Sequence, residues 1–248
     1  MKIRLMLATL AALSISAVAS AQSLDIGKLF GQAKTAVDVV GGTDASDELK
    51  IGREWAGTLL GAAPLVKNDG LQRYVNNVGR WIALHSERPE LAWHFGVLDS
   101  PNINAFATPG GYVFVTRGLM ERMRSEAELA GVLAHEIAHV VQKHHLTAIR
   151  KSKGMGLGGE LLSEFGLKDK GNATVNERLI ASFKEVMVRG LDKSDEYEAD
   201  RMGVVLATRA GYDPFGLPSV LQTLDALDAK DGTLALLLGT HPAPAARL

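Results

Sequence analysis

The sequence predicts a mainly helical α+β fold with a small β-sheet beside its central helix. Three observations indicate this class. Apolar residues recur at helical spacing through much of the chain, and capping residues, glycines and prolines mark the ends of these stretches. Only two short segments, 91–99 and 112–116, have the pattern of strands. The length of 248 residues is enough for one domain with a substantial core.

The composition excludes several kinds of site. The chain has no cysteine, so disulfides, thiolate metal sites and thiol nucleophiles are absent. Its 27 Lys+Arg and 28 Asp+Glu give a net charge of −1, which offers no basic footprint for nucleic acid. Any metal ion must therefore be held by carboxylates and by the seven histidines.

The first 21 residues have the features of a secretory signal peptide. Lys2 and Arg4 precede an apolar stretch over 5–18, and residues 19–21 supply a small-residue cleavage site. The apolar stretch is shorter than the roughly 20 residues that a membrane-spanning helix needs. We therefore expect an exported mature chain without a transmembrane span, for which peripheral contact with a membrane remains open.

The folded domain is expected over residues 46–248, preceded by an N-terminal arm over 22–45 that lacks clear periodicity. Apolar stripes and caps predict helices over 46–60, 69–85, 125–144, 172–189 and 194–210, with another helix beginning at Pro214. The two strands flank a loop over 101–109. The three tryptophans are expected in the core: Trp55, Trp81 and Trp93.

The segment 151–171 contains six glycines. Such a composition disfavours a packed helix or strand, because glycine loses more conformational freedom on folding than other residues. We interpret this segment as a lid or mobile hairpin within the domain.

The residues that carry chemistry form an H-E-x-x-H motif in the helix predicted over 125–144. His135 and His139 are four residues apart and project from one helical face, so both imidazoles can bind one metal ion. Glu136 lies beside the remaining coordination position, where a carboxylate can act as a general base. Two unrelated helical histidines are the simpler alternative.

A catalytic zinc needs a third protein ligand, and three residues compete for that place. His145 is rejected, because a continuous helix after His139 would turn it away; His144 and His145 are then expected to be exposed at the helix end. Glu196 shares a helical face with Asp200, so Glu196 can bind the metal while Asp200 orients a ligand histidine. His241, followed by a proline, is the remaining candidate.

The segment before the second strand offers a place for an extended polypeptide. A glycine pair that precedes an edge strand can leave backbone groups free to pair with another chain. The residues expected to take part are Asn104, Ala105, Phe106, Gly110 and Gly111. An ordinary hairpin turn is the alternative interpretation.

Together these motifs resemble those of the gluzincin peptidases related to the CAAX prenyl protease and the heat-shock protease HtpX, in particular their soluble periplasmic BepA-like branch. The resemblance runs from about Glu48 to the end of the chain and rests on H-E-x-x-H at 135–139, E-x-x-A-D at 196–200, NAFATPGG at 104–111, VTRGL at 115–119, ADRMG at 199–203 and His241-Pro242. It implies a zincin-like metalloprotease core with one zinc ion per chain, ligated by His135, His139 and Glu196, with Glu136 as general base.

The resemblance also implies roles for two late residues. His241 matches a histidine that approaches the zinc and restrains activity, and Arg247 matches an arginine near the active site that can contact substrate or the transition state. The sequence departs from some relatives because it contains neither a tetratricopeptide module nor their membrane spans. The resemblance therefore implies neither the specific partner proteins of those relatives nor prenylated substrates.

These observations lead to one favoured function and two alternatives. We expect a periplasmic zinc endopeptidase that cleaves unfolded or misassembled envelope proteins, outer-membrane proteins among them. A chaperone-like binding protein with a structural or silent metal site is the first alternative. A metallohydrolase acting on a small molecule is the second, and it requires an enclosed pocket rather than a groove beside a strand.

Overall fold

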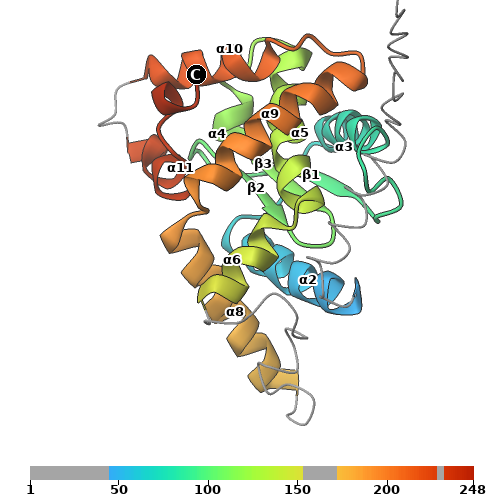
Figure 1. Cartoon of the computed structure of the whole chain (residues 1–248), viewed down its shortest axis with the longest axis vertical. Helices are drawn as coiled ribbons and strands as arrows, with labels where there is room; N and C mark the ends of the chain where they lie inside the picture. Colours follow the sequence, from blue (N-terminus) through green and yellow to red (C-terminus); the bar gives the residue numbers. More distant parts are fainter. Residues whose placement is uncertain (1–44, 153–171, 228–231) are drawn as a thin grey trace, which may run out of the picture. The chain divides into compact units, whose positions relative to one another are not determined.

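The computed structural model describes residues 45–152, 172–227 and 232–248. Three strands form one sheet in the order β1-β3-β2: β1 (His94–Leu98), β2 (Ala105–Thr108) and β3 (Tyr112–Thr116). The central strand, β3, pairs parallel to β1 and antiparallel to β2. Helices cover both faces of this sheet (Figure 1).

The helices occupy most of the described chain. Their bounds are α2 (Ala45–Ala62), α3 (Asp69–Ala83), α4 (Arg117–Met120), α5 (Glu126–Val141), α6 (His144–Ser152), α8 (Asn172–Arg189), α9 (Lys193–Arg209), α10 (Gly216–Asp225) and α11 (Ala235–Thr240), with 3-10 turns η1 (Gly232–Leu234) and η2 (Pro244–Ala246). No helix within the three described ranges is long and apolar enough to cross a membrane.

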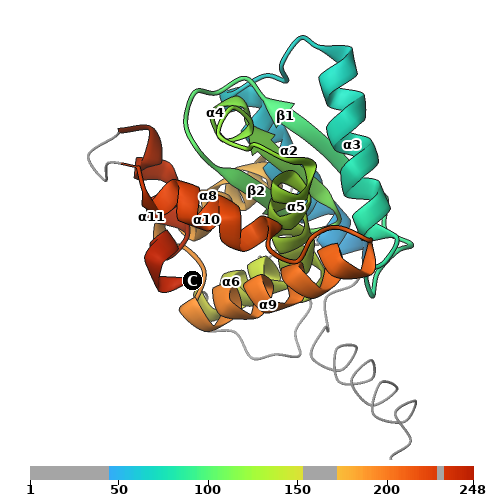
Figure 2. The same cartoon turned by 90° about the horizontal axis from the view of Figure 1, so that it is seen from above.

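The alternation of side chains along the strands divides the core into two parts. One face of the sheet packs against α3 and α5, and it includes Val97, Ala107 and Val113. The other face, with Phe106 and Phe114, packs against α2 and contributes to a second cluster shared with α6 and α8. Seen from above, α5 lies between the sheet and α9 (Figure 2), so it is buried on nearly all sides.

The predicted fold class is confirmed: the part of the chain that the structure describes is mainly helical with one small sheet. Helix α8 has the predicted bounds, and the helices predicted over 46–60, 69–85 and 194–210 differ from α2, α3 and α9 by at most two residues at either end. The helix expected from Pro214 begins at Gly216, and α9 begins at Lys193 with Asp192 in the N-cap position.

Three expectations about the sheet and core were wrong. The segment 101–109 contains strand β2, so it is not only a loop, and β3 is the central strand rather than an edge. Trp55 and Trp93 are buried, but Trp81 is 49% exposed. Its indole Nε1 donates a hydrogen bond to the Ala210 carbonyl at 2.8 Å, so Trp81 ties α3 to the end of α9 at the surface.

The central helix is shorter than predicted, because α5 ends at Val141 and α6 starts at His144. Between them Lys143 has a φ of 56°, the left-handed conformation that non-glycine residues seldom adopt. This residue breaks the helix and redirects the chain. The predicted signal peptide, nearly all of the N-terminal arm and nearly all of the glycine-rich segment lie outside the described residues.

Candidate metal centre

Helix α5 carries the H-E-x-x-H motif into the interior. Its N-terminus is capped by Ser125, whose hydroxyl accepts a hydrogen bond from the backbone N–H of Glu128. One turn apart, His135 and His139 bring their Nε2 atoms within 3.0 Å of each other. Both side chains are buried, with 3% and 0% exposure, so they face a site inside the protein rather than solvent.

Helix α9 supplies the carboxylate that faces these histidines. The Glu196 oxygens lie 3.7 Å from His135 Nε2 and 3.6 Å from His139 Nε2. The approach requires Gly203, because a Cβ at that position would stand 2.9 Å from the His135 backbone nitrogen. Close packing of α9 on α5 therefore fixes the position of Glu196 relative to the two histidines of the motif.

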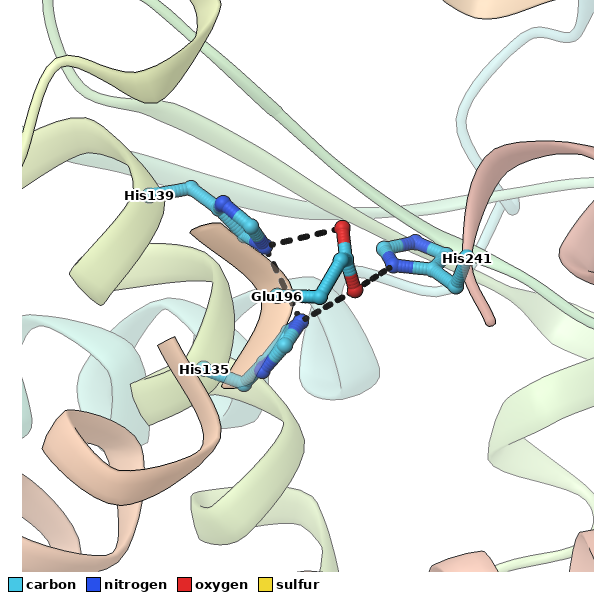
Figure 3. Close-up of side chains that lie close together, drawn as sticks. All are labelled: His135, His139, Glu196 and His241. Carbon is cyan, nitrogen blue, oxygen red and sulfur yellow. Dashed lines mark hydrogen bonds and ion pairs between the residues drawn. The ribbon is translucent and has the colours of Figure 1, made fainter. Parts of the chain in front are cut away.

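His241 completes a group of four. It follows α11, and its Nδ1 lies 2.8 Å from a Glu196 oxygen. One ligand atom from each of His135, His139, Glu196 and His241 lies within 4.8 Å of the others. Figure 3 shows the Glu196 carboxylate between the two histidines of α5 and the imidazole of His241.

This group fits a bound metal ion. Within the described residues, Oε1 of Glu196 is buried and has no hydrogen-bond partner, although it points towards His139. An unpaired buried carboxylate oxygen is costly, and a cation among the four side chains would satisfy it. Imidazole and carboxylate ligands in this number are those that Zn²⁺ takes in proteins.

The electrostatics separate the roles of the two carboxyl groups. Burial raises the pKa of the Glu136 carboxyl, and the neighbouring imidazoles of His135 and His241 oppose this only in part. Burial would also raise the pKa of Glu196, but His241 and His135 outweigh it and hold that pKa at about 2. Glu196 is therefore ionised at neutral pH, whereas Glu136 is suited to take up and release a proton.

Comparison with known proteins places this arrangement in a family. Residues 69–248 match the family described as Peptidase family M48. The chain belongs to peptidase family M48. The beta-barrel assembly-enhancing protease of Escherichia coli (strain K12) is 32% identical over 219 residues, which cover 84% of this chain and 45% of that protein. The mitochondrial metalloendopeptidase OMA1 of Schizosaccharomyces pombe is 31% identical over 178 residues, covering 71% of this chain and 50% of that protein.

A third relative, the mitochondrial metalloendopeptidase OMA1 of Arabidopsis thaliana, is 33% identical over 152 residues, or 61% of this chain and 29% of that protein. The chain spans half the length of these relatives or less. The family assignment confirms the predicted resemblance to gluzincin peptidases, and the names of these relatives, protease and metalloendopeptidase, agree with the predicted enzyme class.

Beside the four-residue cluster, Asp200 and Arg247 support His135. An oxygen of Asp200 lies 3.0 Å from His135 Nδ1, on the side of the ring away from Glu196. Arg247 holds the same carboxylate through two hydrogen bonds, from Nη2 at 2.6 Å and from Nε at 3.1 Å. Despite burial, the hydrogen bonds from His135 and Arg247 hold the pKa of Asp200 below its usual range, so this carboxylate is charged.

His144 and His145 do not occupy the exposed positions expected for them. They are 5% and 6% exposed, because the left-handed Lys143 ends α5 and starts α6 beside it. Nδ1 of His144 lies 2.9 Å from Nδ1 of His139. His145 instead meets the ring of Trp55 edge-on at 5.9 Å, and it is not part of the four-residue cluster.

Strand β2 runs along one side of this site. Ala105 lines two pockets together with Glu136 and His241, and Phe106 and Ala107 line the one that also contains His139. Asn104 is buried and donates a hydrogen bond to the hydroxyl of Thr240, next to His241. The structure therefore brings residues 104–106 to the site.

The glycine pair lies elsewhere, in the turn between β2 and β3. Gly110 and Gly111 have φ values of 78° and 100°, which glycine adopts without strain. Gly110 donates its N–H to Glu48, and Gly111 lies against Trp93. They shape the hairpin and do not line either pocket beside Glu136.

The backbone of β2 has an open side. The Thr116 N–H donates to the Asn104 carbonyl, so 104 and 116 are a hydrogen-bonded pair of the antiparallel ladder. Because such pairs alternate, the N–H and C=O groups of Ala105 and Ala107 point away from β3. Asn104 Oδ1 satisfies the Ala105 N–H, but no backbone group of another described element bonds the Ala105 carbonyl or the Ala107 peptide groups.

Proposed function

We propose that the chain is a zinc-dependent endopeptidase that cleaves extended segments of unfolded or misassembled envelope proteins. The observation that carries this proposal is the position of Glu136, which lines one pocket together with His139 and His241 of the four-residue cluster and with residues of β2. A proton-transfer group, a metal site and a free strand edge then meet at one place. That combination supports hydrolysis of a peptide bond held in an extended conformation.

In this mechanism His135, His139 and Glu196 hold the zinc ion. Zinc bound there would polarise the scissile carbonyl and lower the pKa of an attacking water towards about 7. Glu136 takes a proton from the water and delivers it to the leaving amine nitrogen, a role for which its raised pKa is suited. Asp200 keeps His135 oriented throughout.

The Ala105 carbonyl and the peptide groups of Ala107 would pair with the substrate backbone. Pairing through the backbone selects extended chains and depends little on their side chains. The two pockets beside Glu136 have mainly apolar linings, including Leu119, Val132 and Leu221 in one and Val186 and Leu191 in the other. Such linings favour apolar side chains, which unfolded proteins expose and folded proteins bury.

The site of action we propose is the periplasm. This location rests on the signal-peptide features of residues 1–21. Outer-membrane proteins are the proposed substrates because relatives of this chain are named beta-barrel assembly-enhancing proteases. We propose no nucleic-acid partner, in keeping with the net charge of −1.

We also propose that His241 restrains the enzyme. Its imidazole lines both pockets beside Glu136 and bonds the ligand Glu196, so it lies where substrate and water must enter. Ala105 and Ala107 are only 4% and 2% exposed, so an extended substrate cannot reach β2 until the covering residues move. Replacing His241 with Ala should raise basal proteolysis while zinc stays bound.

The test compares wild type, Glu136→Gln and His241→Ala for zinc content and for cleavage of casein and an unfolded porin. Glu136→Gln should retain zinc and lose activity by about 100-fold or more, because the general base is gone. A chelator should abolish wild-type cleavage, and added zinc should restore it. Unchanged cleavage by Glu136→Gln would refute the assigned role of Glu136, and unchanged or lower cleavage by His241→Ala would refute the restraint.

One observation favours the chaperone-like alternative: His241 is a fourth residue of the cluster, and structural zinc sites are closed by four protein ligands. In that case unfolded porin would bind along β2 without being cut. Binding without cleavage by both wild type and His241→Ala, each with one zinc per chain, would establish this function instead.

A further inference from the structure

The second ring nitrogen of His139 has a partner of its own. His139 directs Nε2 towards Glu196, at 3.6 Å, so its Nδ1 faces the opposite side. There Nδ1 of His144 lies 2.9 Å away, within hydrogen-bond distance. Both rings are buried, with 0% and 5% exposure, so water does not compete for this contact.

The chemistry of imidazole fixes the direction of this hydrogen bond when His139 binds a metal. A neutral imidazole that offers Nε2 to a metal carries its proton on Nδ1 and donates it. His144 Nδ1 must then accept, which places the His144 proton on Nε2. That atom faces Oε2 of Glu198 at 3.6 Å, and Glu198 is on α9 and half exposed. The side chains of His139, His144 and Glu198 thus form a row of contacts from the cluster to the surface.

The same principle operates on the other histidine of the motif. His135 donates from Nδ1 to the Asp200 carboxylate, which Arg247 holds in turn. Each of the two motif histidines therefore has a partner on its outer nitrogen: the largely buried Asp200 of α9 for His135, and the buried His144 at the start of α6 for His139. Such partners fix the tautomer and ring orientation of a metal-binding histidine.

We propose that His144 is a positioning residue that holds His139 in the tautomer and orientation required for metal binding, with Glu198 orienting His144. The left-handed conformation of Lys143 makes this possible, because it returns the chain to His139 immediately after α5 ends. The proposal rests on metal binding at the proposed peptidase site. It adds a residue that touches neither substrate nor metal.

The adjacent His145 provides a matched control. It is as buried as His144, at 6%, and it also lies near His139, with ring centroids 5.6 Å apart. However, its Nδ1 has no hydrogen-bond partner within the described residues, and its ring packs against Trp55. Loss of its imidazole removes packing but no hydrogen bond to a ligand.

The experiment measures zinc affinity of the full chain by competition with a chromophoric chelator. His144→Leu should weaken binding by about 10- to 100-fold, the usual effect of losing such a partner. His144→Asn should restore most of the affinity, because its Oδ1 can accept at the place of Nδ1. His145→Leu should bind as wild type does, and Glu198→Gln should weaken binding less than His144→Leu.

Two further measurements separate positioning from folding. Unfolding of the chelator-treated variants checks that His144→Leu and His145→Leu lose comparable stability. Nitrogen-15 NMR of the zinc-loaded wild type should show the His139 proton on Nδ1. The proposal fails if His144→Asn binds zinc as weakly as His144→Leu, or if His145→Leu weakens binding equally. Failure of wild-type cleavage with these affinities intact would instead count against the peptidase function.

Discussion

At the scale of single residues, the pair of Arg247 and Asp200 has the largest predicted effect on stability. Both side chains are largely buried, at 5% and 13% exposure, and two hydrogen bonds join them. Arg247→Met would leave the Asp200 charge without its partner. Breaking a buried pair from one side costs about 3–5 kcal/mol. We therefore expect a loss of that size in urea unfolding of the chelator-treated protein.

The double variant Arg247→Met with Asp200→Asn is the control, because it removes both charges together. It should recover a substantial part of the lost stability, as expected for coupled residues. Equal destabilisation in the single and double variants would show that the charge pairing contributes nothing. The predicted contact of Arg247 with substrate is a separate matter, which a change in kcat at unchanged zinc content would reveal.

The residues that could be predicted from sequence are those fixed by helical periodicity. The spacing of His135 and His139, and of Glu196 and Asp200, places each pair on one helical face regardless of what packs around it. His144 could not be placed in this way. Its position depends on the left-handed conformation of one residue, Lys143. Glycine or asparagine would suggest that conformation from the sequence, but lysine does not. A continuous helix therefore predicts exposed positions for His144 and His145, which the structure does not have.

At the scale of elements, the close contact of α5 and α9 determines the geometry of the site. Gly203→Ala would put a Cβ 2.9 Å from the His135 nitrogen and 3.0 Å from its Cα, and backbone cannot turn aside as a side chain can. Helix α9 must then move outwards and carry Glu196 with it. We expect weaker zinc binding and a destabilisation of about 1–3 kcal/mol, as overpacking causes elsewhere.

Gly57→Ala in α2 is the matched control. A Cβ there meets nothing within 4 Å, so the same substitution in another helix should stabilise the protein by about 0.5–1 kcal/mol. Zinc titration and urea unfolding of both variants test the argument together. Wild-type zinc affinity in Gly203→Ala would mean that the helix contact does not control the site.

Helices with strong periodicity were predictable, and so were strands β1 and β3, but strand β2 was not. Helices α3, α8 and α9 have apolar stripes and clear ends, so their sequence already determines their bounds to within a few residues. Strand β2 is only four residues long and is buried along its whole length. A short segment buried on both faces shows no alternation of polar and apolar residues. For this reason the sequence predicts a loop at β2, which is one of the two edge strands, and an edge position for β3, which is central.

At the scale of the whole molecule, the interior around α5, α6 and α2 contains an unusual number of histidines. Burial lowers the pKa of His139 and His144, and it lowers that of His145 to about 3. These three rings are thus neutral in the folded, metal-free protein at pH values where the unfolded chain protonates them. The interior therefore binds fewer protons than the unfolded chain does in weak acid.

This difference predicts how stability depends on pH. A histidine in the unfolded chain has a pKa of about 6.5, so below that pH the unfolded state binds protons that the folded state does not bind. The free energy of unfolding of the chelator-treated protein should fall as the pH drops from about 6.5 towards 3, by about 1.4 kcal/mol for each unit of pKa difference. His241 and Glu136 act in the opposite sense, since Glu196 raises the pKa of His241 against the effect of burial and burial raises the pKa of Glu136, but they are two groups against three.

Urea unfolding midpoints at pH 7.5, 6.5, 5.5 and 4.5 measure this slope, and His145→Leu tests its origin. With one buried imidazole removed, the variant should lose less stability between pH 6.5 and 4.5 than the wild type does, although it starts from a lower value. At still lower pH Glu196, with a pKa of about 2, should remain charged after unfolded glutamates are protonated, and this adds a further loss below pH 4.5. A flat profile between pH 7.5 and 4.5, or equal slopes in variant and wild type, would contradict the argument. It would mean that His139, His144 and His145 take up protons in the folded state, because this part of the interior opens to water before the rest of the molecule unfolds.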